Sequence, residues 1–323
     1  MVDRPHKPSA LAATPGLPPQ AQVAISHDNA RVTAQLPSGE SVEVLLFGAT
    51  VTSWKDGRGE EKLWLSEAAR LDGSKAVRGG IPLVFPVFGT APDHPATSQL
   101  SQHGFARTSH WRFFGKSTSE GSSSSSVKLD FGLSSDNLDA AAKKAWPYKF
   151  GLLYSVTLDV GSLSTALVVT NEGDEPFECQ TLLHTYFKID VVVVVVRQDI
   201  SAISISGLEN APYVDKVDGA KAKTEAPGAV TFSGETDRVY TPPKGPKHPI
   251  VVEGSSTRFR IVRDNLEDVV VWNPAEGKAA GMADFEPKHG WRNMVCVEAG
   301  SVRGWQRLEK GDTFEGAQTI YLS

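Results

Sequence analysis

The sequence predicts an all-β fold, an antiparallel β-sandwich with few short helices. Many short segments alternate apolar and polar residues with a period of two, which is typical of strands with one face on a core and one in water. Turn residues such as Gly, Pro, Asn and Asp separate these segments, and helix-favouring stretches are scarce. The chain shows no regular exchange of strands and helices, which argues against a parallel sheet with crossover helices.

The alternation recurs from the first quarter of the chain to its end. Val32, Ala34 and Leu36 face one way, and residues 42–46 repeat the pattern after a turn at residues 37–39. The further alternating segments, in chain order, are residues 127–131, 156–160, 163–169, 203–206, 259–261 and 319–322. Each of them predicts a strand that is buried on one face.

One segment predicts a helix, at residues 137–146. Asn137 is placed to cap it, residues 140–145 are rich in alanine and lysine, and Pro147 ends it.

Several other stretches depart from the alternating pattern. Serine-rich residues 116–126 predict a mobile hairpin connection, and residues 220–228 and 241–249 predict loops rich in Pro, Gly and Lys. The valine run at residues 191–196 fits either a strand buried on both faces or an aggregation-prone window.

Size and charge limit the classes of function. With 323 residues, 40% of them hydrophobic and 22% charged, the chain is an ordinary globular protein that can bury a large core. Its formal net charge of −5 provides no basic field for nucleic acid or an anionic membrane surface. No apolar run reaches the eighteen residues of a membrane span. An anion would therefore have to be bound by local arginines.

The N-terminal residues and the cysteines indicate the compartment. Residues 1–20 contain several prolines and no continuous apolar stretch, so we expect a disordered tail rather than a secretory signal. Cys179 and Cys296 both lie in apolar, strand-like segments. Two thiols do not make a disulfide framework, so we expect buried structural thiols and a cytoplasmic location.

Two residues are candidates for proton transfer. His184 stands in an apolar and aromatic setting, and we expect its imidazole to lie at the end of a strand. Its ordinary pKa of about 6.5 lets a histidine give or take a proton near neutrality. Glu298 ends the apolar run at residues 294–297, where a carboxylate is costly unless it is paired, solvent-accessible or functional. A satisfied core histidine and a paired surface glutamate are the alternatives.

Four further residues are candidates for substrate binding. Arg78 and Arg107 carry guanidinium groups that suit a carboxylate or a phosphate. His103 precedes a glycine, so a tight turn there would direct its ring into a cleft. Asp237 precedes Arg238, and a turn carboxylate or an ion pair between these two neighbours is its simplest explanation.

Nucleotide and metal sites find little support in these segments. The Arg-Gly-Gly-Ile-Pro sequence at residues 78–82 has neither the Lys-Ser/Thr of a phosphate-binding loop nor the spacing of a dinucleotide fingerprint. His103, His184 and Glu298 would make a set of two histidines and one carboxylate. No pair of histidines is close in sequence, so we expect no metal.

Taken together and in order, these segments resemble the hexose-6-phosphate mutarotases, the glucose-6-phosphate 1-epimerases of the aldose 1-epimerase superfamily. The matching segments are residues 78–82 with 85–89, 103–107, 183–187, 207–208 with 213–216, 236–240, 271–274, 282–285 and 295–298. They spread over residues 45–320, and several are distinctive.

The resemblance implies a galactose-mutarotase-like β-supersandwich, formed as a single domain by residues 21–323. It also implies that His184 and Glu298 are catalytic, that His103 and Asp237 contact sugar hydroxyls, and that Arg78 and Arg107 hold the phosphate. The substrate would be a hexose 6-phosphate, and no cofactor would be needed. We also expect a monomer.

The implied reaction fits these residue types. Ring opening needs a base for the anomeric hydroxyl proton and an acid for the ring oxygen, and Glu298 as carboxylate and His184 as imidazolium would serve. The charge of Glu298 is expected to favour protonated His184.

Two alternatives remain at this point. One is a carbohydrate-binding sandwich without activity, and the other is a glycoside hydrolase that uses Asp237 and Glu298 as its carboxylate pair.

The chain departs from the family pattern in two places. These are the valine run at residues 191–196 and the segment 286–290, in which Lys288 or His289 would add to phosphate binding or be plain surface residues.

Overall fold

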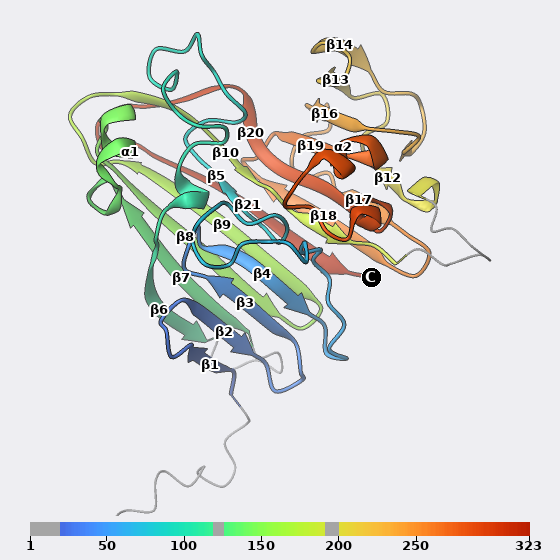
Figure 1. The fold of residues 1–323 in the computed structure, drawn as a ribbon, viewed down its shortest axis with the longest axis horizontal. Coiled ribbons are helices and arrows are strands. Elements are labelled where there is room, and N and C mark those ends of the chain that lie inside the picture. Colours follow the sequence, from blue (N-terminus) through green and yellow to red (C-terminus); the bar gives the residue numbers. More distant parts are fainter. Residues whose placement is uncertain (1–19, 119–125, 191–199) are drawn as a thin grey trace, which may run out of the picture.

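The computed structural model describes residues 20–118, 126–190 and 200–323, and in this part of the chain strands dominate (Figure 1). The strands form three sheets, and all pairs between the named strands are antiparallel. The predicted all-β class is therefore confirmed. Among the described residues no helix is long and apolar enough to cross a membrane.

The first sheet is made by strands near the N-terminus. In order, it contains β1 (Gln22–Ile25), β2 (Arg31–Gln35), β3 (Ser41–Leu45) and β4 (Thr50–Lys55).

The second sheet carries the residues of the candidate site. Its order is β14 (Lys221–Thr224), β13 (Pro212–Asp215), β16 (Thr236–Tyr240), β19 (Asp268–Asn273), β20 (Met294–Leu308), β10 (Phe177–Leu183) and β5 (Leu83–Val84), and β11 (Tyr186–Lys188) also pairs with β20. In Figure 1 the long β20, drawn in red, runs between β19 and β10.

The third sheet closes the other side of the core. Its order is β15 (Val230–Thr231), β12 (Ser204–Ser206), β17 (Ile250–Glu253), β18 (Arg258–Asp264), β21 (Thr313–Leu322), β9 (Ser162–Asn171), β8 (Phe150–Asp159), β7 (Val127–Ser134) and β6 (Arg112–Thr118). The main apolar core contains buried side chains of all three sheets, among them Val44, Val271 and Val156.

Helices in the described residues are short. They are α1 (Ala140–Ala145), α2 (Ala275–Gly281) and the 3-10 turns η1 (Ala106–Thr108), η2 (Ser135–Asn137), η3 (Ile200–Ala202) and η4 (Lys288–Arg292).

The predicted helix exists, but its cap was predicted wrongly. The carboxylate of Asp139, not the amide of Asn137, accepts a hydrogen bond from the backbone N–H of Ala142 at 2.8 Å. Asn137 instead ends η2 and contacts the side chain of Ser134. Because the cap lies two residues later than predicted, the helix begins later and is shorter than predicted.

Most alternating segments are confirmed as strands buried on one face. Val127, Leu129 and Phe131 are buried on β7, whereas Val160 lies in the turn after β8 and is 53% exposed. Residues 220–228 were predicted as a loop but contain β14, an edge strand of exposed polar residues that lacks the apolar face on which the pattern depends.

Some predictions fall wholly or partly on residues that the structure does not describe. The tail at residues 1–20 lies almost entirely outside the described residues, and the valine run at 191–196 lies wholly outside them. The serine-rich segment 116–126 is partly outside, but β6 and β7 pair as the predicted hairpin requires.

Candidate active site

A cavity of about 210 Å³ opens on one face of the second sheet. Its floor is formed by strands whose residues alternate between the cavity and the core. The lining side chains are Arg78, Phe88, Gln102, His103, His184, Lys216, Asp237, Val270, Trp272, Lys278, Met282 and Glu298. Five of the six predicted site residues line this cavity, namely Arg78, His103, His184, Asp237 and Glu298, and Arg107 does not.

The register of the sheet explains why these residues meet. Asp237 on β16 is opposite Trp272 on β19, which is opposite Cys296 on β20, and the next row places Val270 opposite Glu298. Side chains two positions apart on a strand share a face, so these residues face the same side of the sheet. The residues between them, such as Val271, belong to the main core.

Glu298 lies in the middle of a long strand rather than at its end, which corrects the prediction. β20 continues through Gly300 to Leu308 because β10 and β19 both pair with it beyond Glu298. Burial on both faces removes the alternation, so the sequence shows a continuous apolar run instead. The side chain of Glu298 is 1% exposed.

His184 follows directly after β10, as predicted for a histidine at a strand end. Its backbone N–H donates to the carbonyl of Pro82 at 3.0 Å. Its ring stacks on Tyr186, with centroids 4.7 Å apart and planes at 9°. This leaves the imidazole Nδ1 3.5 Å from Oε1 of Glu298. The two candidate proton-transfer groups are therefore neighbours in a buried place.

Burial sets the protonation of this pair. It lowers the pKa of His184 well below its ordinary value, and the nearby His103 and Arg107 add to the effect. Burial also raises the pKa of Glu298 well above its ordinary value, with Asp237 contributing. Both directions oppose the prediction that the charge of Glu298 would favour protonated His184, because burial disfavours the charged form of each group. They favour a neutral imidazole next to a neutral carboxyl group.

His103 lies in a tight turn, as predicted from the glycine that follows it. His103 and Gly104 have φ angles of 67° and 69°. The backbone N–H of Gly89 donates to His103 Nδ1 at 3.1 Å, so the neutral ring carries its proton on Nε2. Burial, followed by Arg107 and Lys216, lowers the pKa of His103 to about 2. His103 is thus a neutral hydrogen-bonding group at the cavity.

Gly104→Ala is expected to destabilise this turn. A Cβ at this position would lie 2.2 Å from the carbonyl oxygen of Phe85, so the backbone must move. Together with the left-handed φ, this predicts a loss of about 2–4 kcal/mol in the free energy of unfolding. Gly161→Ala is the control, because its φ is 72° but no atom lies within 4 Å of the added Cβ. Equal losses in urea denaturation would contradict a role for the close contact at Gly104.

Arg78 is held by two neighbours beside the cavity. Its NH1 donates to the hydroxyl of Tyr186 at 3.1 Å, and its NH2 pairs with Oδ2 of Asp284 at 3.2 Å. Burial by itself would lower the pKa of Arg78, but Tyr186 and Asp284 outweigh it and the pKa is raised. The guanidinium is fixed, charged and partly accessible. Tyr186 thus contacts both His184 and Arg78.

Arg107 is close to this group but does not line the cavity. It belongs to η1, and its NH2 donates to the backbone carbonyl of Gln102 at 2.9 Å. Its Nε is buried and has no hydrogen-bond partner among the described residues. Burial lowers the pKa of Arg107 to about 10. It faces the neighbouring cavity of about 440 Å³ that also borders α1.

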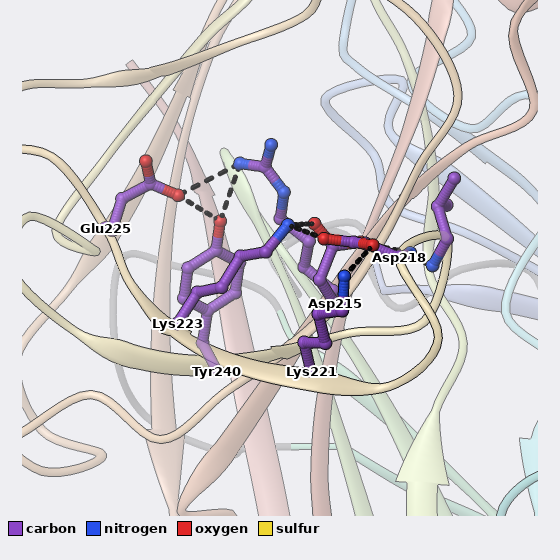
Figure 2. Close-up of polar contacts among 8 residues, drawn as sticks. Asp215, Asp218, Lys221, Lys223, Glu225 and Tyr240 are labelled. Atoms are coloured by element: carbon purple, nitrogen blue, oxygen red, sulfur yellow. Dashed lines mark hydrogen bonds and ion pairs between the residues drawn. The ribbon is translucent and has the colours of Figure 1, made fainter.

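Asp237 does not pair with Arg238, which corrects the simplest explanation of this residue. Consecutive strand residues point to opposite faces. Asp237 pairs with Lys216 at 3.3 Å beside the cavity, whereas Arg238 pairs with Glu225 at 3.0 Å. Figure 2 shows Glu225 next to the hydroxyl of Tyr240, with which it also forms a hydrogen bond.

The hairpin of β13 and β14 holds this part of the sheet in place. Lys223 bridges Asp215 and Asp218, at 2.8 Å to each, and Lys221 pairs with Asp218 (Figure 2). Lys216 follows directly after β13, so the hairpin sets the position of one cavity cation.

Sequence reasoning missed several lining residues. Lys216 and Lys278 bring two more cations to the cavity, and each has a carboxylate partner, Asp237 for Lys216 and Glu235 for Lys278. Lys216 lies in a segment that matches the resembled family, but no charge pattern sets it or Lys278 apart. Among these missed residues, Gln102 could have been found from the sequence, because it directly precedes His103.

The two residues left open in segment 286–290 do not line the cavity. Lys288 donates to the backbone carbonyl of Met282 at 2.6 Å and pairs with Glu286 at 3.3 Å. His289 lies in η4. Lys288 therefore holds the loop that contains Met282.

The potential metal ligands that lie close together differ from those considered from the sequence, because Cys296 takes the place of His103. In the described residues His184, Cys296 and Glu298 offer ligand atoms within 4.8 Å of one another. Cys296, like Cys179, is free and buried, as predicted for both thiols.

Comparisons with known proteins identify the family of this chain. The sequence profile of the family described as aldose 1-epimerase matches residues 30–321. A protein of Escherichia coli (strain K12) named "Putative glucose-6-phosphate 1-epimerase" is 34% identical over 278 residues, which is 86% of this chain and 85% of that protein. A protein of the same name from Cenchrus ciliaris is 33% identical and covers 85% of this chain and 79% of its own length.

Solved structures give the same fold. A crystal structure titled as a putative mutarotase (YeaD) from Salmonella typhimurium has a TM-score of 0.77 and 28% identity, and covers 95% of both chains. The galactose 1-epimerase from Lactobacillus acidophilus NCFM has a TM-score of 0.68 at 14% identity, covering 94% of this chain and 98% of its own. At that identity the second likeness concerns the fold alone.

Proposed function

The chain belongs to the aldose 1-epimerase family and is an epimerase, and from this premise we propose that it interconverts the α and β anomers of a hexose 6-phosphate, with glucose 6-phosphate as the first candidate. The observation that carries the proposal is the buried pair of His184 and Glu298, 3.5 Å apart, with the fixed guanidinium of Arg78 lining the same cavity. The names of the relatives support the choice of substrate.

The pair suits an opening and closing of the sugar ring. One group removes the proton of the anomeric hydroxyl while the other protonates the ring oxygen, and the C–O bond of the ring breaks to leave an aldehyde. Closure on the other face of the carbonyl reverses both transfers. We assign Glu298 as the base and His184 as the acid.

A single proton on the pair is sufficient for this cycle. We propose that in the free site the carboxyl of Glu298 holds it, since burial raises the pKa of Glu298 and lowers that of His184, and that its transfer to His184 produces the carboxylate and imidazolium without changing the net charge. A dianionic phosphate bound nearby would favour the positive imidazolium. Each opening takes one proton from the sugar and returns one, so the pair regains its state after every turnover.

The cations around the cavity fit a phosphate ester. Arg78 presents a planar guanidinium, and Arg107 lies close enough to affect the pKa of both catalytic groups. We propose that both help to hold the phosphate. His103 and Asp237 line the cavity as neutral donor and carboxylate, which suits contacts with sugar hydroxyls.

Anomer-exchange NMR tests the substrate directly. We expect fast exchange between the anomers of glucose 6-phosphate, with slower exchange for galactose 6-phosphate and unphosphorylated glucose. Saturable binding without faster exchange would instead indicate a carbohydrate-binding protein without this activity. Release of reducing sugar from glycosides would indicate a hydrolase.

The pH dependence of kcat/KM is expected to be bell-shaped. Activity requires one proton on the pair, so it falls at low pH when His184 also binds a proton, and at high pH when Glu298 loses its own. Because the pKa of His184 is lowered and that of Glu298 is raised, the acid limb lies below about 6.5 and the alkaline limb above about 4.5. Glucose should be measured alongside the 6-phosphate, since the phosphate itself titrates near 6.

Arg107→Met is expected to move both limbs to higher pH. The positive charge of Arg107 lowers the pKa of His184 and of Glu298, so its loss raises both. Arg307→Met is the control, because Arg307 pairs with Glu309 on the surface. A profile that keeps its position in Arg107→Met would show that other groups set the limbs.

Two further expectations concern the setting of the enzyme. We propose that it acts in the cytoplasm, because its two cysteines are free and buried, and that it acts as a monomer. Sedimentation would test the second.

A further inference from the structure

Cys296 adds a third kind of ligand atom to the catalytic pair. Cys296 and Glu298 are two positions apart on β20, so their side chains share the face that His184 approaches from the end of β10. A nitrogen, a sulfur and a carboxylate oxygen of these residues lie within 4.8 Å of one another. All three residues are buried.

Two polar atoms in this group have no hydrogen-bond partner among the described residues. They are Nδ1 of His184 and Oε2 of Glu298, although the side chain of Glu298 is 1% exposed and the residue His184 is 8% exposed. Buried polar atoms are normally satisfied, so such a pair indicates a group that binds there. The cavity touches both residues and leaves one side open for a further ligand such as water.

Most of the cations around the group are balanced by carboxylates. Arg78, Lys216 and Lys278 each form an ion pair with a carboxylate, whereas Arg107 forms none among the described residues and its charge opposes a bound cation. Glu298 pairs with His184 and with no lysine or arginine of the described residues. A bound divalent ion would displace the protons of the Cys296 thiol and the Glu298 carboxyl to solvent, and the resulting thiolate and carboxylate would balance its charge.

We propose that His184, Cys296 and Glu298 bind a thiophilic divalent cation of the Zn²⁺ type, and that the bound ion inhibits the enzyme. One nitrogen, one thiolate and one carboxylate with an open fourth position form a common zinc ligand set. Zinc–ligand distances of about 2.0–2.3 Å require the three side chains to close by about 1 Å. The ion would occupy both groups that transfer protons, so inhibition rests on the proposed function, whereas binding does not.

Cobalt spectroscopy tests the binding without any sugar. Co²⁺ added to the whole protein should produce a thiolate-to-cobalt charge-transfer band in the near ultraviolet, and excess Zn²⁺ should remove it. Cys296→Ala should lose the band, and Cys296→Ser provides a second version if the alanine leaves a harmful cavity. Cys179→Ala is the matched control, because Cys179 is an equally buried free thiol in the main core. A band that survives in Cys296→Ala, or none in the wild type, would overturn the site.

Inhibition by Zn²⁺ tests the second half of the proposal. Cys296→Ala should keep most of its activity but need at least about tenfold more Zn²⁺ for half-inhibition, since even indirect partners of a metal site are worth about 10–100-fold in affinity. Cys179→Ala should stay as sensitive as the wild type. Equal sensitivity in Cys296→Ala would refute inhibition through this site. A cobalt band in a protein without anomer exchange would retain the metal site and refute the proposed function instead.

Discussion

Glu298→Gln is expected to lower kcat/KM for anomer exchange by about 10²–10⁴-fold, the usual contribution of a general acid or base. The amide has nearly the same shape, and burial raises the pKa of Glu298, which favours its uncharged form in the free site. The substitution therefore removes the transferable proton with little effect on packing. Exchange NMR at saturating and at low glucose 6-phosphate measures the loss. The same loss is expected for His184→Ala.

The control for this result is Glu309→Gln, the same chemical change just beyond the end of β20, where Glu309 pairs with Arg307. It should retain full activity, and both variants should keep the circular dichroism of the wild type. Near-wild-type exchange in Glu298→Gln would remove Glu298 from the proton transfers. Loss of folded protein in Glu298→Gln would show a structural role. His184→Ala and its control His289→Ala, at an exposed histidine of η4 outside the cavity, would then separate this role from catalysis.

Arg78→Ala is expected to reduce the preference for the phosphorylated sugar by about 10–100-fold. A charge-assisted hydrogen bond contributes about 1.5–3 kcal/mol, which corresponds to that range. The loss should appear mainly as a higher KM for glucose 6-phosphate, while unphosphorylated glucose is little affected. Removal of the guanidinium also leaves Asp284 unpaired near the phosphate, which adds repulsion. The measured quantity is the ratio of kcat/KM for the two sugars.

Arg107→Ala is expected to reduce the same preference. Arg307→Ala, at the surface, should leave kcat/KM unchanged for both sugars. If Arg78→Ala lowers kcat/KM equally for both sugars, the guanidinium positions His184 through Tyr186 instead of binding phosphate. Tyr186→Phe distinguishes these explanations, because it keeps the ring stacked on His184 and removes only the hydroxyl that Arg78 contacts.

Sequence reasoning predicted the strands best where one face of the strand is exposed to solvent. On β7 the buried Val127, Leu129 and Phe131 alternate with partly exposed residues, and the pattern is visible. On β19 all six residues are buried, because one face packs on the core and the other lies under the site. A period of two cannot appear there. The part of the sheet that holds the candidate catalytic groups is thus the part where the sequence shows no alternation.

The helix shows a second limit of local reasoning. Two possible caps, Asn137 and Asp139, precede the same alanine run, and only the path of the chain after β7 decides between them. Short-range propensity names the residue types suited to a cap but not which one reaches the backbone N–H.

Local patterns along the chain were sufficient to predict the all-β class, the strand position of His184, the turn at His103 and the set of residues worth testing, because each depends on sequence neighbours. Contacts between distant segments were needed to show which of those residues share a cavity, that Arg107 borders the neighbouring cavity, and that Lys216 rather than Arg238 is the partner of Asp237. The structure also showed that burial lowers the pKa of His184, against the expectation of a protonated imidazole. A pKa depends on burial and on charges contributed by distant segments, and these exist only after the sheets have packed.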